Sequence, residues 1–197
     1  MPFMLLFISF FSFALNVSAI AYKATNLRAS SLQIQRALSE LPPQDVLNLQ
    51  VMLGKKLIFS RAYKRNIKLG FALLEQAADK NHMGALNALG VIYMKGLRGA
   101  KEITKNIKKS QGYFLRASSH KSATAFFYLA EIENKGLMGG EPDLKKAISY
   151  YVKAAQLRHR KAKKVLKKLA GQGNADAQKA WVHLSKASPS RPLRKKG

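Results

Sequence analysis

A pattern that repeats at a nearly fixed interval is the feature that most constrains this chain. Asn-Ile-Lys at Asn66 recurs at Asn106, and Asp-Leu-Lys takes the same place at Asp143, so the steps are 40 and 37 residues. Lys-Gly-Leu at Lys95 recurs 40 residues later at Lys135. A period of this length predicts a solenoid, in which each unit buries its apolar face only against its neighbours. A solenoid usually works by presenting a binding surface, so a catalytic site is inferred only where specific residues indicate one.

Apolar residues at helical spacing divide the chain into short helices joined by glycine-containing turns. In the clearest copy, Ala85, Ala88, Leu89 and Ile92 follow the i, i+3, i+4, i+7 pattern of one helix face. Proline at positions 42 and 43 is expected to end the first helix. The expected helices span residues 27–41, 44–59, 85–94, 106–119, 143–157 and 161–170, followed by a last helix that Asn174 caps.

Two further features recur at fixed places in the copies. Asn66, Asn106 and Asp143 each precede a helix, where their side-chain oxygens can accept hydrogen bonds from free backbone N–H groups. Small residues then recur within those helices and allow close approach of a neighbour. They are Ala77, Ala117 and Ala154.

At these positions the chain resembles the Sel-one-like repeat (SLR) family, a relative of tetratricopeptide repeats. The resemblance implies an all-α fold, an α/α right-handed solenoid of about three to four repeats over residues 45–187. A capping helix in residues 22–44 precedes it, and a basic tail in residues 188–197 follows. The repeat signature consists of Asn66, Ala77, Leu89, Gly90, Tyr93, Gly96, Asn106, Ala117, Gly136, Asp143, Ala147, Tyr151, Ala154 and Ala155.

The chain departs from the family pattern where each second helix of a repeat ends. The family's glycine is replaced by Asn81, Lys121 and Arg158. Asparagine tolerates the left-handed backbone conformation of a helix C-cap, whereas lysine and arginine adopt it less readily. In the first copy, Ser60 takes a glycine position and Gly70 an alanine position, so this copy is expected to be degenerate.

The first 22 residues carry no charged side chain and include an apolar run from Phe3 to Leu15. Small residues near Ala19 and Ala21 suit signal-peptidase cleavage, so residues 1–21 are expected to be a secretory signal peptide. No lysine or arginine precedes the run, which keeps an uncleaved membrane anchor and a misassigned start as alternatives. A secreted or periplasmic protein is the leading expectation.

Positive charge is the second dominant property, because 35 Lys and Arg against 10 Asp and Glu give a net charge of +25. Such a surface attracts anions, although lysine-rich surfaces also serve solubility. Seven cations crowd into residues 158–168, and within residues 161–170 they lie opposite an apolar helix face. We call these seven the basic ridge and expect it to bind a partner or an anion, extended by cations in residues 191–196. The basic ridge consists of Arg158, Arg160, Lys161, Lys163, Lys164, Lys167 and Lys168.

No constellation for catalysis, cofactor or metal binding stands out. The chain has no cysteine. His82 and His159 occupy one slot in two different repeats, too far apart to share an ion. Glu131 and Glu133 are two residues apart and point to different sides of a helix. Most aromatic residues are expected in the core, and one or two on a binding surface. The chain is therefore expected to be no enzyme and to take no small-molecule substrate.

These observations, with the resemblance, lead to one main functional prediction and two alternatives. Members of the family are often bacterial, and the resemblance implies an exported, non-catalytic protein-interaction scaffold that binds a protein, expected to be acidic, on its concave face. The first alternative is a polyanion-binding protein, for nucleic acid, an envelope polymer or a membrane surface. The remote alternative is a cell-envelope hydrolase.

Overall fold

The computed structural model describes residues 43–59, 66–97, 100 and 103–186. Within these ranges the regular elements are all α-helices, and the chain forms two compact units, one ending at Leu89 and the other beginning at Gly90. None of the described helices is long and apolar enough to cross a bilayer. The predicted signal peptide, the predicted helix at 27–41 and the basic tail lie outside the described residues.

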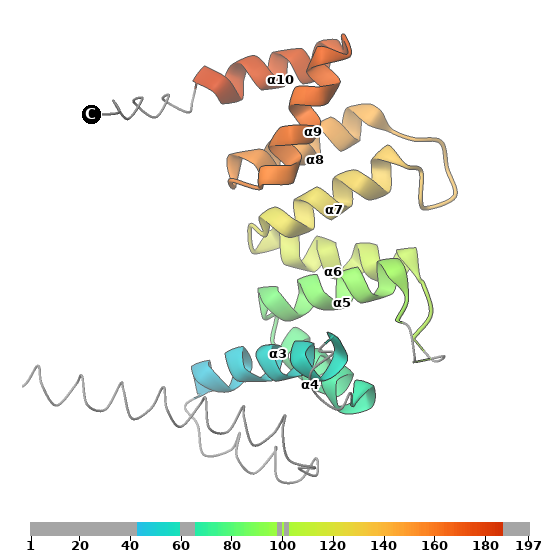
Figure 1. The fold of residues 1–197 in the computed structure, drawn as a ribbon, viewed down its shortest axis with the longest axis vertical. Helices are drawn as coiled ribbons and strands as arrows, with labels where there is room; N and C mark the ends of the chain where they lie inside the picture. The colour runs from blue at the N-terminus through green and yellow to red at the C-terminus, as the bar shows by residue number, and fades with distance from the viewer. Residues whose placement is uncertain (1–42, 60–65, 98–99, 101–102, 187–197) are drawn as a thin grey trace, which may run out of the picture. The chain divides into compact units, whose positions relative to one another are not determined.

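Eight helices follow one another along the described residues (Figure 1). Residues 44–59, 106–119, 143–157 and 161–170 were expected to be helical, and each expectation is confirmed within one or two residues. One boundary differs by a residue, because the helix expected from residue 44 begins at Pro43, as proline's fixed φ allows at a first helical position. The helices are α3 (Pro43–Phe59), α4 (Ile67–Asp79), α5 (Met83–Lys95), α6 (Ile107–Ser119), α7 (Ala123–Asn134), α8 (Leu144–Gln156), α9 (Arg160–Gly171) and α10 (Ala175–Lys186).

In the first unit, α3 packs against α4 through two facing glycines. A Cβ atom built on Gly70 would lie 2.8 Å from the carbonyl oxygen of Gly54, and one built on Gly54 would lie 2.8 Å from the carbonyl oxygen of Gly70. The two backbones therefore touch where other pairs of helices keep a side chain between them. Gly70, which made the first copy look degenerate in sequence, is what permits this close packing.

In the second unit, successive helices from α6 to α10 pack against each other in chain order (Figure 1). The core between α7, α8, α9 and α10 is built from small and medium apolar side chains around Tyr151. The Tyr151 ring is fully buried, and its hydroxyl donates a hydrogen bond to Glu131. Burial, followed by the Glu131 carboxylate, raises the pKa of Tyr151 far above its ordinary value, so the phenol remains a donor.

The predicted caps begin the second helix of each repeat. The side chain of each cap residue accepts a hydrogen bond from the backbone N–H group three residues later in the chain. The distances are 3.1 Å at Asn66, 2.9 Å at Asn106 and 2.8 Å at Asp143. Each cap residue also closes the preceding turn, because its own N–H donates to a carbonyl near the end of the previous helix. The acceptors are Leu57, Tyr93 and Glu133.

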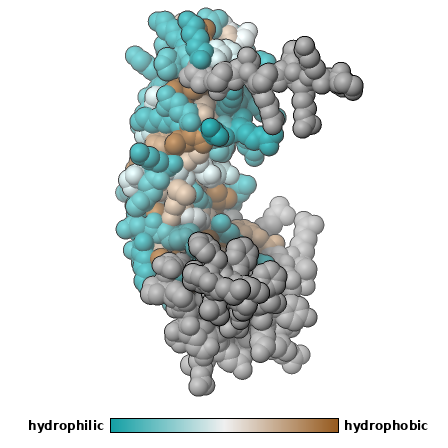
Figure 2. Space-filling model, turned by 90° about the vertical axis from the view of Figure 1, so that its left-hand side faces the viewer, coloured by the Kyte–Doolittle hydropathy of each residue, from teal (hydrophilic) through white to brown (hydrophobic). Residues whose placement is uncertain are grey.

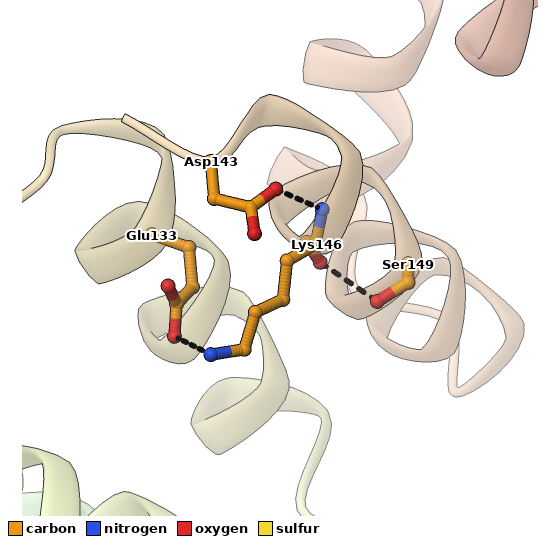
Figure 3. Close-up of polar contacts among 4 residues, drawn as sticks. All are labelled: Glu133, Asp143, Lys146 and Ser149. Atoms are coloured by element: carbon orange, nitrogen blue, oxygen red, sulfur yellow. Dashed lines mark hydrogen bonds and ion pairs between the residues drawn. The ribbon is translucent and has the colours of Figure 1, made fainter. Parts of the chain in front are cut away.

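One pair of positions links the two helices of a repeat by two different kinds of contact. In one repeat, the Lys109 ammonium lies 5.3 Å from the centre of the Tyr93 ring. In the next, the equivalent Lys146 forms an ion pair of 2.8 Å with Glu133, which raises the pKa of Lys146 (Figure 3). These two repeats thus share a lysine on the second helix, and its partner is an aromatic ring in one and a carboxylate in the other.

Asn81, Lys121 and Arg158 all adopt the left-handed conformation, with φ values of 57°, 56° and 63°. They stand where the family pattern has glycine, so the turn keeps its geometry although the residue type has changed. For residues with a Cβ atom this conformation costs roughly 1–2 kcal/mol, less for asparagine than for the others. Two of the three repeats therefore hold a long cationic residue against its backbone preference.

Replacing Lys121 with glycine is expected to raise the free energy of unfolding by about 0.5–1 kcal/mol. The left-handed conformation loses its steric cost, and the greater freedom of glycine in the unfolded chain cancels part of the gain. Urea denaturation followed by circular dichroism measures the change. Lys121→Ala is the control, because it removes the same charge and keeps the Cβ atom. Equal stability of the two variants would show that charge, and not backbone strain, governs this position.

Candidate partner-binding site

All seven residues of the basic ridge are exposed to solvent. They lie at the start of α9 and along the side of α9 opposite its buried residues Ala162 and Leu166. In the view of Figure 2, hydrophilic residues cover most of the upper part of the surface, with smaller hydrophobic areas between them. The structure thus brings the ridge together on one helix and its preceding turn.

Acidic residues do not neutralise the ridge within the described part of the chain. Glu131 and Glu133, which were expected to point to different sides of α7, bind Lys135 and Lys146 respectively, at 2.6 and 2.8 Å. No member of the ridge forms an ion pair with a described carboxylate. Lys163 instead lies over the Trp181 ring of α10, 5.8 Å from its centre. The ridge therefore keeps its positive field.

The first three cations of the ridge border a pocket of about 360 Å³. This pocket lies between the start of α7 and the turn that joins α8 to α9. Cations and hydroxyl groups lie beside two aromatic rings, so an anion and an apolar group could both find contacts there. The lining residues are Ala123, Thr124, Phe127, Tyr128, Leu157, Arg158, His159, Arg160 and Lys161.

Stacked rings hold the aromatic side of the pocket in place. Phe127 stacks on the imidazole of His159, with 4.5 Å between ring centres, and meets the edge of Tyr128 at 5.4 Å. Tyr128 in turn stacks on the buried Phe114 at 5.0 Å. These contacts fix the rings before any ligand arrives, which lowers the ordering cost of binding.

His159 has a structural task within the pocket wall. Its Nδ1 accepts a hydrogen bond of 3.3 Å from the backbone N–H of Ala162 and so caps α9. Burial, followed by repulsion from Lys161, lowers the pKa of His159, so the ring stays neutral near pH 7 and can accept that bond. His82 lies in the other unit, with its Nε2 3.0 Å from Oδ1 of Asn48.

Helix starts add to the positive potential of the pocket. Ser122 caps α7, and the next two residues, Ala123 and Thr124, line the pocket. Arg160 and Lys161 form the first turn of α9. Because the N-terminus of a helix already carries partial positive charge, cations there are unfavourable unless an anion is close. The geometry therefore favours a negatively charged ligand.

The alanines and glycines of the repeat signature serve helix packing and turns rather than binding. The signature alanines Ala77, Ala117, Ala147 and Ala154 are fully buried between helices. Gly96 and Gly136 adopt positive φ values in the turns. No group of three or more histidine or acidic residues in the described ranges could hold a metal ion. The predicted extension of the ridge into residues 191–196 lies outside the described residues.

Phe127 and Tyr128 belong to the aromatic residues that were expected mostly in the core, with one or two on a binding surface, and the sequence did not indicate which of them line the pocket. Thr124, Leu157 and the capping role of His159 were missed as well. A signal for the cap exists in the sequence, because His82, Ser122 and His159 each stand three residues before a buried alanine of the following helix, namely Ala85, Ala125 and Ala162. Nothing in the spacing shows which rings would reach the turn of the following repeat.

The fold and its repeated turns define an α/α repeat protein. The Sel1 repeat family matches residues 50–82, 84–122 and 124–159, which is more than half of the chain. The chain therefore belongs to the Sel1 repeat family, and the resemblance seen in the sequence is confirmed. Sel1 repeats are generally protein–protein interaction modules.

Two solved structures share the fold. A Sel1 repeat protein from Oxalobacter formigenes is similar with a TM-score of 0.63 and 16% identity, over 87% of this chain and 72% of that one. A protective antigen of uropathogenic Escherichia coli with an SLR fold is similar with a TM-score of 0.60 and 21% identity, over 81% of this chain. The match spans only 33% of the antigen's length. No curated protein matches the chain in sequence.

Proposed function

We propose that this chain is a non-catalytic scaffold that binds an acidic protein partner through the basic ridge. The observation that carries the proposal is seven exposed cations on one helix and its preceding turn, with no described carboxylate paired to them. Membership of a family of interaction modules supports a protein as the partner. Electrostatic attraction of this kind mainly raises the association rate and sets specificity.

A charge-reversal experiment tests the proposal. The chain and a Lys164→Glu/Lys167→Glu/Lys168→Glu variant would be immobilised and exposed to cell-envelope extract at physiological salt, and the retained proteins identified by mass spectrometry. Acidic proteins retained by the native chain are expected to be lost from the variant. Circular dichroism checks that both proteins are folded.

A matched control separates the ridge from net charge. Lys68, Lys108 and Lys145 are exposed and occupy one equivalent position in three repeats. Their reversal to glutamate changes the net charge by the same amount and places acids at helix starts, where the dipole favours them. This control is expected to keep the retained proteins. Equal losses from both variants, or nothing retained by the native chain, would contradict the proposal.

The ridge also favours a polyanion as a second candidate ligand. Dense lysines that neutralise phosphates release counterions, so affinity for an oligonucleotide would fall steeply with salt. A protein partner that is retained at physiological salt and lost on charge reversal of the ridge would favour the scaffold. Export stays an expectation from residues 1–21, and N-terminal sequencing of the native protein would test it.

A further inference from the structure

The turn that forms the pocket can be compared with the same turn in the other two repeats. The three turns read Asn-His-Met-Gly from Asn81, Lys-Ser-Ala-Thr from Lys121 and Arg-His-Arg-Lys from Arg158. All three share a first residue with positive φ. The second residue begins the next helix, as Ser122 and His159 do by capping. The first two residues therefore form the turn and the helix start in each copy, whereas the character of the last two changes from copy to copy.

Only the third turn fills those last two positions with cations. Arg160 and Lys161 follow the cap of α9, where methionine with glycine and alanine with threonine stand in the other turns. Arg158 adds a third charge, and its backbone adopts a conformation that disfavours side chains. Cations at a helix start and a positive φ at a residue with a Cβ atom are both locally unfavourable. No evident structural gain offsets them here, and such a pattern is typical of functional positions.

The size and the walls of the pocket suggest which anion fits. A volume of about 360 Å³ exceeds what a single carboxylate needs. Phe127 and Leu157 offer apolar contact, while the three cations border the same space. The pocket therefore suits an acidic side chain together with an apolar neighbour.

The rings of the pocket favour an aliphatic neighbour over a nucleic-acid base. One face of Phe127 is already stacked on His159, and one face of Tyr128 on Phe114. A base seeks a free aromatic face for stacking, whereas an aliphatic side chain also packs well against ring edges. A protein ligand thus matches the walls better than a single-stranded nucleic acid does.

We propose that this pocket binds an internal acidic segment of the protein partner, with a glutamate or aspartate side chain at Arg158, Arg160 and Lys161 and an aliphatic neighbour against Phe127. The inference rests on the proposed function and adds a defined anchor to it. The bound carboxylate also neutralises the crowded start of α9, so binding is expected to stabilise the folded chain.

A fluorescence-anisotropy titration tests the pocket. The probe is a short fluorescein-labelled peptide, acetylated and amidated, in which one leucine lies between pairs of glutamates. Replacing its glutamates with glutamines, or its leucine with glycine, is expected to weaken binding by about tenfold or more, because each change removes one of the two contacts. Binding that depends on a free carboxyl terminus, and is therefore absent with the amidated peptide, would overturn the proposal.

Two variants that each remove two positive charges test whether the peptide binds in the pocket or elsewhere on the ridge. Arg160→Gln/Lys161→Gln removes pocket cations, and Lys167→Gln/Lys168→Gln removes cations of the same helix outside the pocket lining. The first variant is expected to lose about tenfold in affinity and the second less than about threefold. Equal losses would overturn the pocket while leaving the basic ridge, and so the proposed function, intact.

A second matched pair uses the shared turn. Arg158→Gly and Lys121→Gly both relieve positive φ in equivalent positions, and only Arg158 lines the pocket. Both variants are expected to melt at a higher temperature, and Arg158→Gly alone is expected to bind the peptide several-fold more weakly. A single-stranded oligonucleotide is added to this assay as a competitor of the peptide. If it displaces the peptide, and its affinity falls more in the Arg160→Gln/Lys161→Gln variant than in the Lys167→Gln/Lys168→Gln variant, the pocket binds nucleic acid and the proposal is overturned.

Discussion

Replacing Gly70 with alanine is expected to lower the free energy of unfolding of the first unit by about 2 kcal/mol. The new methyl group would lie 2.8 Å from the carbonyl oxygen of Gly54 and 2.8 Å from Cγ1 of Ile58. A backbone oxygen cannot rotate away as a side chain can, so α3 and α4 must move apart. Overpacking of this kind costs typically 1–3 kcal/mol even after repacking.

The glycine that faces Gly70 is expected to behave in the same way. An alanine at Gly54 would meet the carbonyl oxygen of Gly70 at 2.8 Å and Cγ of Leu74 at 2.9 Å. Urea denaturation curves of both variants measure the loss, and hydrogen exchange of α3 and α4 assigns it to the first unit. We expect the double variant to be less destabilised than the sum, because one separation of the helices admits both methyl groups.

Gly112 supplies the control for these substitutions. It lies within α6, is exposed, and a Cβ atom there would meet nothing within 4 Å. Alanine at Gly112 is therefore expected to stabilise the chain by about 0.5–1 kcal/mol, through the better helix propensity of alanine. If alanine at Gly70 raised the free energy of unfolding as much as alanine at Gly112 does, α3 and α4 would not lie too close together to admit a methyl group.

Repetition explains why much of the fold could be predicted. Caps such as Asn106 and Asp143 act through local hydrogen bonds whose partners lie three residues away, so spacing alone reveals them. The buried alanines follow from the same period. The first copy was harder to interpret, because Gly70 departs from the repeat and its reason lies on another helix, at Gly54.

The candidate site shows where prediction from sequence ended. The cations of the ridge could be found because they crowd into a short stretch opposite an apolar face. The pocket could not, because it joins residues about one repeat apart, such as Thr124 and Arg160. Ring stacking between Phe127 and His159 depends on side-chain orientation across that junction, which periodicity does not determine.

Gly90 and Phe114 are expected to show strong energetic coupling in the second unit. A Cβ atom on Gly90 would lie 2.6 Å from Cε1 of the fully buried Phe114 ring. Alanine at Gly90 is therefore expected to destabilise the chain by about 2 kcal/mol. Phe114→Ala is expected to cost about 3–5 kcal/mol, because it removes a large buried side chain and leaves a cavity.

In the double variant, the sign of the Gly90 substitution is expected to reverse. Once Phe114 is alanine, the methyl group at position 90 enters the cavity instead of the ring, and helix propensity also favours alanine. Gly90→Ala should then stabilise the Phe114→Ala protein by about 1 kcal/mol, measured by urea denaturation. If Phe114→Ala does not fold, Phe114→Leu gives a milder version of the same cycle. Additive effects would refute the coupling.

The next repeat already has alanine at the position of Gly90, which agrees with the expected reversal of the Gly90→Ala effect. The position of Gly90 is occupied there by Ala130, and that of Phe114 by Tyr151, and both are fully buried. The Tyr151 hydroxyl is held by Glu131 on α7, whereas Phe114 has no hydroxyl and stacks on Tyr128. The repeat therefore tolerates a methyl group at this helix contact, and glycine is required at position 90 because of how the Phe114 ring lies.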